Sequence, residues 1–412
     1  MNSLPIFYEG QEIARLIQTP HGYLELEYTK NWQLHGFDIS ISLPRLNIRH
    51  TGDNVRTFFE NILPEGRIRE SLARQFRTSK ENIFGLLKHI GQDCAGAFSI
   101  GGPATRGTYK ELSPGQIQSL LHKLPEFPMA TSEQHTSLSL AGAQHKLPLF
   151  QKDGVFYLPQ QGAASNCIIK LPINEFPHSI ENEHFCLELA TRIGIPTVRS
   201  RILQLPDHKV LVVERYDREG SDFHPRRLPQ EDFCQISAIS SALKYEQDGG
   251  PSFYDCAVLI RRYSMQPALD VSLMVKWAAF NLCVGNNDAH AKNISMMRQE
   301  NGLKLAPFYD LLSTTYYGRK LARRMAMGIG GKRNSFFISR HRWERFAQDI
   351  RLPEKAVLQL AKSTAESILT ALDTTAAALT KSGIPENTIQ RLTEHIRFRT
   401  AGVLEHLEFP RN

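Results

Sequence analysis

VGNNDAHAKNIS, from Val284 to Ser295, is a short polar segment between two apolar stretches of the chain. An apolar run that ends at Cys283 precedes it, and LAPFYDLLS, from Leu305 to Ser313, follows it. The segment combines an aspartate with carboxamides, a histidine and a lysine. This is the composition of a functional site, and the rest of the chain is interpreted from it.

The acids in and after this segment indicate chemistry on a magnesium nucleotide. Asp288 and Asn293 are five positions apart, as in the catalytic loop of protein kinases, where the aspartate accepts the proton of the attacking hydroxyl and the asparagine binds magnesium. Asp310 follows inside an apolar sequence, where a charge is costly unless it is paired or holds a metal. The spacing alone also arises by chance, and a polar run between apolar runs is often a solvated loop.

Length, composition and charge limit the class of protein. A chain of 412 residues is long enough for two or three domains, and 41% hydrophobic with 22% charged residues is typical of a globular protein. The net charge of +7 favours contact with an anionic molecule, such as a nucleic acid, a nucleotide or an acidic partner. We expect no signal peptide, because Glu9 and Glu12 interrupt the start of the chain.

The longest apolar run, from Val271 to Val284, is broken by Lys276 and Asn281, which predicts no membrane span and a cytoplasmic protein. The cysteines are scattered, without a CxxC pair. This favours reduced, buried thiols over disulfides or structural zinc. They are Cys94, Cys167, Cys186, Cys234, Cys256 and Cys283.

The pattern of apolar residues divides the chain into three parts. Residues 1–103 predict a small α+β subdomain, with strands up to about residue 45, including FDISISL, and a helix from Asp53 to Asn61 followed by a second helix. After the linker GGPATRGTY, residues 104–245 are rich in strands, and residues 246–412 are helical. We therefore expect an α+β fold with a β-rich lobe and an all-helical C-terminal lobe. The expected helices of that lobe are Asp255 to Arg262, Leu269 to Cys283, Arg342 to Ile350, Glu354 to Lys381 and Glu386 to Leu407.

The β-rich part offers candidate phosphate and nucleotide contacts. Small side chains in the turn from Ala141 to Gln144 would let backbone amides approach a phosphate, although an ordinary hairpin has the same pattern. Lys170 lies in the apolar strand CIIKLP, so it either needs an anion or reaches solvent at a sheet edge. On the following helix Glu183, or else Glu181, could hold this lysine. Glu214 to Tyr216 lies at a strand exit, where a hinge would offer backbone groups and a ring to adenine.

Positive charge is concentrated near the acids. Lys292 precedes Asn293 and is either a surface lysine or a cation that neutralises phosphate charge in the transition state. Between Gly318 and Phe346 there are nine Lys and Arg residues against one acid, Glu344. Such a run is a solvated face or a surface for an acidic substrate or a nucleic-acid backbone.

Taken together, the ordered motifs resemble those of the HipA family of bacterial serine/threonine kinase toxins. They are FFENILPEG, IGQDCAGAF, SLSLAGAQHK, IIKLP, VERYDR, RLPQEDFCQ, KYEQDGGP, GNNDAHAKN, LAPFYDLLS and MAMGIGGK, and they run nearly the whole length of the chain. The resemblance implies a two-lobed, protein-kinase-like fold, ATP and Mg²⁺ as cofactors, and a DNA-binding antitoxin of the HipB type as partner. Operator DNA would be reached through that antitoxin.

The resemblance also implies roles for individual residues. Asp288 would be the catalytic base, Asn293 and Asp310 the magnesium ligands, and Lys170 the phosphate lysine. The remaining nucleotide contacts would be the phosphate loop Ala141, Gly142, Ala143, Gln144, His145 and Lys146, the hinge Glu214, Arg215 and Tyr216, and further contacts from His290 and Tyr309.

Ser139 matches the phosphate-loop serine that members of the family autophosphorylate, and Ser137 is the alternative. Asp310 is followed by two leucines and not by Phe-Gly, so the substrate cannot be inferred from ordinary kinases. Within the family the best-known substrate is an aminoacyl-tRNA synthetase, so the resemblance implies a component of translation as substrate, with growth arrest and persistence as the outcome.

Three hypotheses follow. The first is an active Ser/Thr protein kinase toxin that phosphorylates a component of translation. The second is a kinase-silent co-repressor bound with an antitoxin to operator DNA, and the third is a phosphotransferase that acts on a small molecule.

Overall fold

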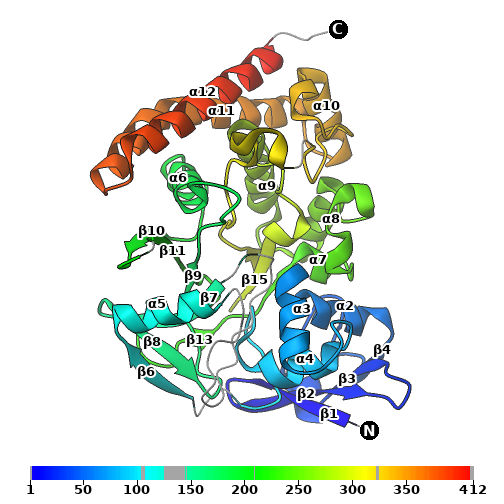
Figure 1. The fold of residues 1–412 in the computed structure, drawn as a ribbon. Coiled ribbons are helices and arrows are strands. Elements are labelled where there is room, and N and C mark those ends of the chain that lie inside the picture. Colours follow the sequence, from blue (N-terminus) through cyan, green and yellow to red (C-terminus); the bar gives the residue numbers. More distant parts are fainter. Residues whose placement is uncertain are drawn as a thin grey trace. The chain divides into compact units, whose positions relative to one another are not determined.

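The computed structural model describes residues 2–103, 107–124, 144, 146–207, 209–321 and 324–408. The chain forms two compact units (Figure 1). Unit 1 consists of Met1–Leu171 and Leu203–Ala242, and unit 2 consists of Pro172–Ile202 and Leu243–Asn412. Unit 1 therefore contains the predicted N-terminal subdomain and most of the predicted β-rich lobe. The boundaries at residues 103 and 245 stay a prediction.

The first sheet of unit 1 is antiparallel, with the strand order β4-β3-β2-β1-β5. Its strands are β1 (Asn2–Tyr8), β2 (Gln11–Gln18), β3 (Leu24–Tyr28), β4 (Arg49–Thr51) and β5 (Ser99–Ile100). Leu4, Ile6 and Tyr8 alternate along β1 and are buried on one face, as a period of two residues requires. Glu9 and Gly10 have positive φ angles of 46° and 80°, so they form the tight turn that joins β1 to β2.

Helices pack against this sheet and close its core (Figure 1). They are α1 (Lys30–His35), α2 (Asp53–Asn61), α3 (Gly66–Gln75) and α4 (Ile83–Ile90). The prediction of a helix at Asp53–Asn61 is confirmed, and Phe58 and Phe59 are buried on it. The predicted strand FDISISL is wrong: residues 40 and 43 form only an isolated bridge. The hydroxyl of Tyr28 satisfies this backbone instead, because it donates to Leu43 O at 2.6 Å and accepts from Ile39 N at 2.8 Å.

The second sheet of unit 1 has the order β10-β11-β9-β7-β8-β6. Its strands are β6 (Thr108–Leu112), β7 (Lys146–Lys152), β8 (Val155–Gln160), β9 (Cys167–Lys170), β10 (Ser200–Gln204) and β11 (Lys209–Glu214). β9 pairs with β7 on one side and with β11 on the other, so it lies inside the sheet. The helix α5 (Pro114–Lys123) starts at a Ser113 capping box.

Unit 2 is predominantly helical. Its helices of eight or more residues are α6 (Ser179–Arg192), α8 (Phe253–Tyr263), α9 (Pro267–Val284), α10 (Arg340–Asp349), α11 (Glu354–Lys381) and α12 (Glu386–Glu408). Every helix predicted for the C-terminal part is confirmed. Glu354–Lys381 has the predicted bounds, and the other helices have ends shifted by one or two residues. The shifts follow caps: α8 begins after a Ser252 capping box, and α9 has Pro267 at its first position.

The prediction of an all-helical lobe is wrong at residues 295–305. There β15 (Ser295–Gln299) and β16 (Gly302–Leu305) form an antiparallel hairpin, in which Gln299 pairs with Gly302. The turn between them is Glu300–Asn301, and Gly302, the first residue of β16, has a φ of +140°. Asn-Gly between short apolar segments is a strong local signal for such a turn.

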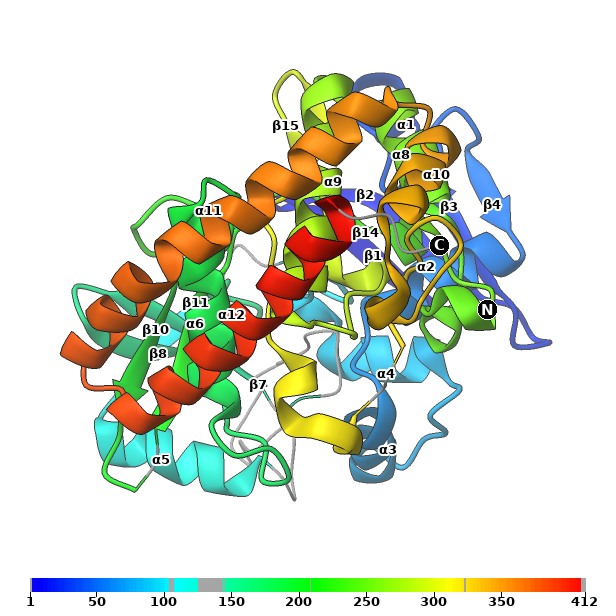
Figure 2. The same cartoon turned by 90° about the horizontal axis from the view of Figure 1, so that it is seen from above.

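Long helices surround α9 in unit 2. α11 and α12 lie side by side, and α9 packs against both of them and against α8 (Figure 2). Within the described residues α9 alone is long and apolar enough to cross a membrane by length and composition. However, 67% of that window is buried inside the protein, as expected for a core helix that is apolar on all sides.

Candidate functional site

The polar segment begins where α9 ends, at Gly285. This residue has φ +77° and caps the helix in the left-handed region. A Cβ atom at this position would lie 1.9 Å from Oγ1 of Thr315 and 2.5 Å from Nε of Arg399. Arg399 also donates from Nη2 to the carbonyl of Leu282 at 3.1 Å, which satisfies an end group of α9. Only glycine fits this turn, so the cap of α9 fixes the direction in which the backbone enters the polar segment.

Buried carboxamides then fix the backbone before Asp288. Asn286 donates from Nδ2 to Oδ1 of Asn281 at 2.9 Å and accepts from the Asp288 amide at 3.1 Å. The amide of Asn287 donates to Oγ1 of Thr314 at 2.8 Å. Because buried polar groups need such partners, these asparagines hold the segment in shape. The sequence interpretation gave them no role, although their position between apolar runs was visible.

Asp288 is half-buried and held by a tyrosine. The hydroxyl of Tyr245 donates to its Oδ1 at 2.7 Å. The carbonyl of Asp288 accepts from the His290 amide at 2.8 Å and from Nδ2 of Asn293 at 3.0 Å. A short 3₁₀ turn, Ala291–Asn293, thus folds the chain back. The five-residue spacing therefore brings Asn293 next to the backbone of Asp288.

His290 is neutral in this environment. It is only 5% exposed, and its ring is perpendicular to that of Tyr245, with the ring centroids 5.4 Å apart. Burial, together with the nearby positive charges of Lys244 and Lys292, lowers the pKa of His290 to about 3, and the charge of Asp310 acts in the opposite direction. These interactions place both lysines and Asp310 around the ring. Its Nδ1 atom is buried and has no hydrogen-bond partner among the described residues.

Asp310 has an unusual backbone. Its φ is +52°, a left-handed conformation that aspartate adopts more readily than most residues. The carbonyl of Asp310 accepts a long hydrogen bond of 3.4 Å from Nδ2 of Asn286. Leu311, the next residue, is fully buried. The backbone that carries the second acid is therefore held against the polar segment.

Tyr309 stabilises the backbone of the polar segment at Lys292. Its hydroxyl donates to the carbonyl of Lys292 at 2.8 Å and lies 2.6 Å from the hydroxyl of Ser295. Lys292 is itself buried, which excludes the alternative of an ordinary surface lysine. The hydroxyl of Tyr309 thus fixes the loop backbone.

In unit 1, Lys170 is the last residue of β9 and is 4% exposed. It pairs with Lys146 of β7 and with Leu211 of β11. This central position excludes a lysine that reaches solvent at a sheet edge, and a buried ammonium requires anionic or hydrogen-bonding partners. The helix α6 of unit 2 carries the two candidate acids, Glu181 and Glu183, and both are buried.

Most of the predicted phosphate loop lies outside the described residues. This applies to Ala141, Gly142, Ala143 and His145, and to the serines Ser137 and Ser139. Gln144 is described, and its Nε2 donates to the carbonyl of Leu171 at 2.7 Å. Lys146 begins β7. Gln144 and Lys146 therefore both lie beside the end of β9.

The predicted hinge residue Arg215 has a structural role that the sequence did not reveal. Its guanidinium donates to both carboxylate oxygens of Asp217, at 2.9 Å from Nε and 2.7 Å from Nη2. It also donates to the hydroxyl of Ser165 at 2.9 Å. The backbone amide of Arg215 donates to the carbonyl of Asn166 at 2.9 Å. Glu214 beside it is exposed, and the hydroxyl of Tyr216 donates to Gln230 at 2.9 Å.

These contacts belong to a buried ion cluster within unit 1. Its members are Asp93, Arg215, Asp217, Arg218 and Arg227, all buried. Asp93 lies 2.9 Å from Arg218, 3.1 Å from Arg227 and 3.6 Å from Arg215. Burial alone would raise the pKa of Asp93 and of Asp217, but the surrounding guanidiniums hold both well below the ordinary value. The cluster ties the connection after α4 to the strand exit at Glu214.

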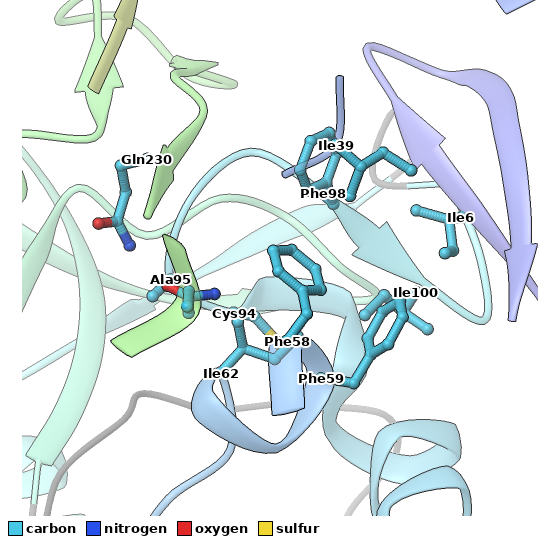
Figure 3. Close-up of a pocket in the computed structure, with 11 residues that line it drawn as sticks. Ile6, Ile39, Phe58, Phe59, Ile62, Cys94, Ala95, Phe98, Ile100 and Gln230 are labelled. Carbon is cyan, nitrogen blue, oxygen red and sulfur yellow. The ribbon is translucent and has the colours of Figure 1, made fainter. Parts of the chain in front are cut away.

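Unit 1 also contains a small, mostly apolar cavity (Figure 3). Its volume is about 10 Å³, enough for about one water molecule. It is lined by residues of α2 and of the segment 94–100, including Phe58, Phe59, Cys94 and Phe98. A nucleotide does not fit this space.

A bound Mg²⁺ ion would need oxygen ligands. Among the residues described, no group of three or more His, Cys, Asp or Glu side chains could hold a metal ion. Mg²⁺, however, is usually held by one or two carboxylates together with phosphate oxygens and water. The amide of Asn293 directs Nδ2 toward Asp288, which leaves its oxygen for another partner. An asparagine oxygen and an aspartate are therefore a chemically suitable set for Mg²⁺ with a nucleotide.

Family models match both halves of the chain. A model described as "HipA N-terminal domain" matches residues 4–101, and one described as "HipA-like C-terminal domain" matches residues 138–372. The resemblance inferred from the motifs is therefore confirmed.

Individual relatives match over most of their length. The protein named "Putative kinase Y4mE" from Sinorhizobium fredii is 36% identical over 388 residues, which are 90% of this chain and 92% of that protein. The "Serine/threonine-protein kinase toxin HipA" of Shewanella oneidensis is 29% identical over 348 residues, 81% of this chain and 79% of that one. The solved structure of HipA from Shewanella oneidensis MR-1, in a complex with HipB and its operator DNA, superposes with a TM-score of 0.87 at 25% identity and covers 98% of each chain. The expected α+β fold, with N-terminal sheets and a helical C-terminal part, is thus confirmed.

Proposed function

The chain belongs to the HipA-like kinase family, and we propose that it is an ATP-dependent serine/threonine protein kinase that acts as the toxin of a toxin-antitoxin system. The observation that carries this proposal is the arrangement at Asp288, where Tyr245 holds the carboxylate and the returning turn brings Asn293 beside the backbone. We also propose that the fold is protein-kinase-like, with a β-rich and a helical lobe, and that the protein is cytoplasmic.

The proposed reaction transfers the γ-phosphoryl group of ATP to a serine or threonine hydroxyl. The hydroxyl oxygen forms a bond to the γ-phosphorus, the bond from that phosphorus to the bridging oxygen breaks, and ADP leaves with the electron pair. Asp288 accepts the proton of the attacking hydroxyl. The hydrogen bond from Tyr245 fixes one carboxylate oxygen, so the carboxylate is already oriented when the substrate arrives.

Asn293 and Asp310 are the proposed magnesium ligands. When bound, Mg²⁺ would neutralise charge on the phosphates and orient them. Asn293 would use its amide oxygen, because Nδ2 is held by the Asp288 carbonyl. Asp310 has a left-handed backbone and lies in the apolar sequence LAPFYDLLS, where a carboxylate is costly unless it is paired or holds a metal.

Cationic and neutral groups complete the proposed nucleotide contacts. Lys170 is the proposed phosphate lysine, supported by its burial inside the second sheet. Lys292 would stabilise the negative charge of the transition state. His290 would contact the nucleotide as a neutral ring, because its pKa is lowered to about 3. Proposed contacts also include Tyr309, the hinge Glu214–Tyr216 and the phosphate loop 141–146.

The partners follow from the relatives. The superposed HipA structure was solved with HipB and operator DNA, and we propose a HipB-like DNA-binding antitoxin as partner here, with operator DNA reached through it. The proposed protein substrate is a component of translation such as an aminoacyl-tRNA synthetase, and its phosphorylation would lead to growth arrest and persistence. Autophosphorylation is proposed at Ser139, with Ser137 as the alternative.

The same structural relative also favours a second candidate, a kinase-silent co-repressor bound with the antitoxin to operator DNA. The net charge of +7 agrees with this role. It predicts salt-sensitive operator binding without phosphotransfer.

The test is phosphotransfer from γ-labelled ATP with Mg²⁺, using protein first treated with phosphatase and checked by intact mass. The assay is run with and without cell lysate, and mass spectrometry locates the label. Label on a lysate protein and on Ser139 or Ser137 supports the kinase toxin. Label on a metabolite supports a small-molecule phosphotransferase. No transfer from unmodified protein, together with operator binding in the presence of antitoxin, supports the co-repressor.

A further inference from the structure

A single buried carboxamide in unit 2 binds both backbone groups of one residue. Asn182 lies in α6 and is fully buried. Its Nδ2 donates to the carbonyl of Ser313 at 2.9 Å, and its Oδ1 accepts from the amide of Ser313 at 2.8 Å. The two residues are 131 positions apart in the chain. The carboxamide thus pairs with Ser313 as a neighbouring strand would.

Ser313 belongs to the segment that carries Asp310. Only Leu311 and Leu312 separate the two residues, and Leu311 and Ser313 are fully buried. A displacement of Ser313 would therefore move the backbone of Asp310, because close packing leaves the intervening residues little freedom.

The opposite side of this segment is held by the polar segment after α9. The carbonyl of Asp310 accepts from Asn286. Oγ1 of Thr314 donates to the carbonyl of Gly285 at 3.0 Å, and the amide of Thr315 donates to the same carbonyl at 3.0 Å. The segment is therefore fixed on one side to the residues around Asp288 and on the other side to α6.

We infer that Asn182 is a positioning residue that sets the place of Asp310 by tying its backbone segment to α6. The inference rests on the proposed function, in which Asp310 is a magnesium ligand. It means that the position of α6 relative to the Asp310 segment is fixed. The same helix also carries Glu181 and Glu183. A displacement of α6 would then change metal binding without any contact between α6 and the metal.

Ser313 offers a matched control. Asn182 contacts the backbone of Ser313, and the hydroxyl of Ser313 is buried without a hydrogen-bond partner in the described structure. Ser313→Ala removes that hydroxyl and keeps both bonds from Asn182. Tyr317→Phe is a second control, because Tyr317 accepts a longer bond of 3.2 Å from the same Nδ2 and does not belong to the Asp310 backbone.

The test compares Mg²⁺-dependent ATP binding by the full chain and its variants, measured by calorimetry over a range of Mg²⁺ concentrations. Asn182→Asp keeps the shape but cannot donate to the Ser313 carbonyl, and Asn182→Ser removes both bonds without adding a charge. All variants are studied below their measured melting temperatures. Phosphotransfer is measured in parallel, so that kcat and the Mg²⁺ requirement are separated.

We expect both Asn182 variants to need about tenfold more Mg²⁺ for half-maximal ATP binding, which corresponds to loss of a hydrogen bond to a buried backbone group. ATP binding without Mg²⁺ stays within about twofold of wild type, and both controls stay within about twofold throughout. An unchanged Mg²⁺ requirement with only a lower melting temperature would overturn the inference. So would a failure of both variants to fold, because Asn182 would then be a folding residue. If wild type shows neither Mg²⁺-dependent ATP binding nor phosphotransfer, the proposed function itself fails.

Discussion

The hydroxyl of Tyr245 lies 2.7 Å from Oδ1 of Asp288 and donates a hydrogen bond to it. A local turn holds Tyr245 in place, because the amide of Gly250 donates to its carbonyl at 3.0 Å. A Cβ atom at Gly250 would lie 2.3 Å from the carbonyl of Leu243, so the turn requires glycine. The KYEQDGGP motif therefore supports the proposed base from outside the polar segment.

Tyr245→Phe removes this hydrogen bond and leaves the ring beside His290. A hydrogen bond to a charged group contributes about 1.5–3 kcal/mol, so kcat for phosphotransfer should fall about 10- to 100-fold. ATP affinity should change little. Tyr254→Phe is the control, because Tyr254 is an exposed tyrosine on α8. Equal kcat values for the two variants would show that Tyr245 does not orient Asp288.

Gly285→Ala should disturb the end of α9. The added Cβ would lie 1.9 Å from Thr315 Oγ1, in a backbone conformation that costs a non-glycine residue about 1 kcal/mol or more. Gly383 has φ +92° and open space around it, so Gly383→Ala carries the conformational cost alone. We expect Gly285→Ala to lower the free energy of urea unfolding by at least about 2 kcal/mol more than Gly383→Ala does. Equal losses would mean that packing at Gly285 is not tight.

Asp217→Asn should destabilise unit 1 strongly. It removes the nearer carboxylate partner of the buried Arg215 guanidinium and leaves only Asp93, at 3.6 Å. Breaking a buried ion pair costs about 3–5 kcal/mol. Chemical denaturation monitored by circular dichroism measures this loss. Asp222→Asn is the control, because Asp222 pairs with Lys152 at 2.7 Å but its side chain is exposed. A loss below about 1 kcal/mol for Asp217→Asn would contradict the importance of the cluster.

The same cluster predicts an acid dependence. The folded pKa of Asp217 lies below the ordinary value of about 3.9 because the neighbouring guanidiniums outweigh burial. Its contribution to stability is therefore fully present above that value and is lost as pH falls toward the folded pKa. Between pH 6 and pH 3 the free energy of unfolding should fall by about 1 kcal/mol more in wild type than in Asp217→Asn. Parallel pH curves would contradict the lowered pKa.

His290 should stay neutral where ordinary histidines become charged. Its folded pKa is about 3, below the unfolded value of about 6.5. The unfolded state therefore binds the extra proton first, and the stability associated with the neutral ring is lost as pH falls from about 6.5 toward 3. Nuclear magnetic resonance of labelled histidine rings, with His290→Gln to identify the signal, should show no titration of His290 down to pH 5. A midpoint near 6.5 would mean that the ring is accessible to water.

Local patterns in the sequence predicted much of the fold. The helix Glu354–Lys381 was predicted at the correct bounds, because its apolar residues recur at helical spacing over many turns. The helix Asp53–Asn61 was predicted equally well. The hairpin of β15 and β16 was missed although Asn301-Gly302 marks its turn, because its strands are short. The false strand FDISISL failed for a different reason, since its partner is the side-chain hydroxyl of Tyr28.

The site was predictable only where its residues are close in sequence. The spacing of Asp288 and Asn293 drew attention to this segment, and the structure brings Asn293 beside the backbone of Asp288. Their roles stay a prediction. The pairing of Asn182 with Ser313 joins distant parts of the chain, and no local pattern encodes it. The contacts of the ion cluster are equally long-range. From the sequence, Arg215 was interpreted only by its position at a strand exit. Its partner Asp93 lies in the motif IGQDCAGAF, which supported the family resemblance but did not indicate the contact with Arg215.

The central claim is that Asp288 accepts the proton in phosphoryl transfer. The most direct test compares wild type with Asp288→Asn, whose remaining oxygen can still accept the hydrogen bond from Tyr245. ATP binding is measured by calorimetry and single-turnover transfer of γ-labelled phosphate is measured on the same preparations. The account predicts binding within about threefold of wild type and a transfer rate at least about 100-fold lower, the size of effect expected from losing a general base. A variant that binds ATP and transfers phosphate at the wild-type rate would contradict it.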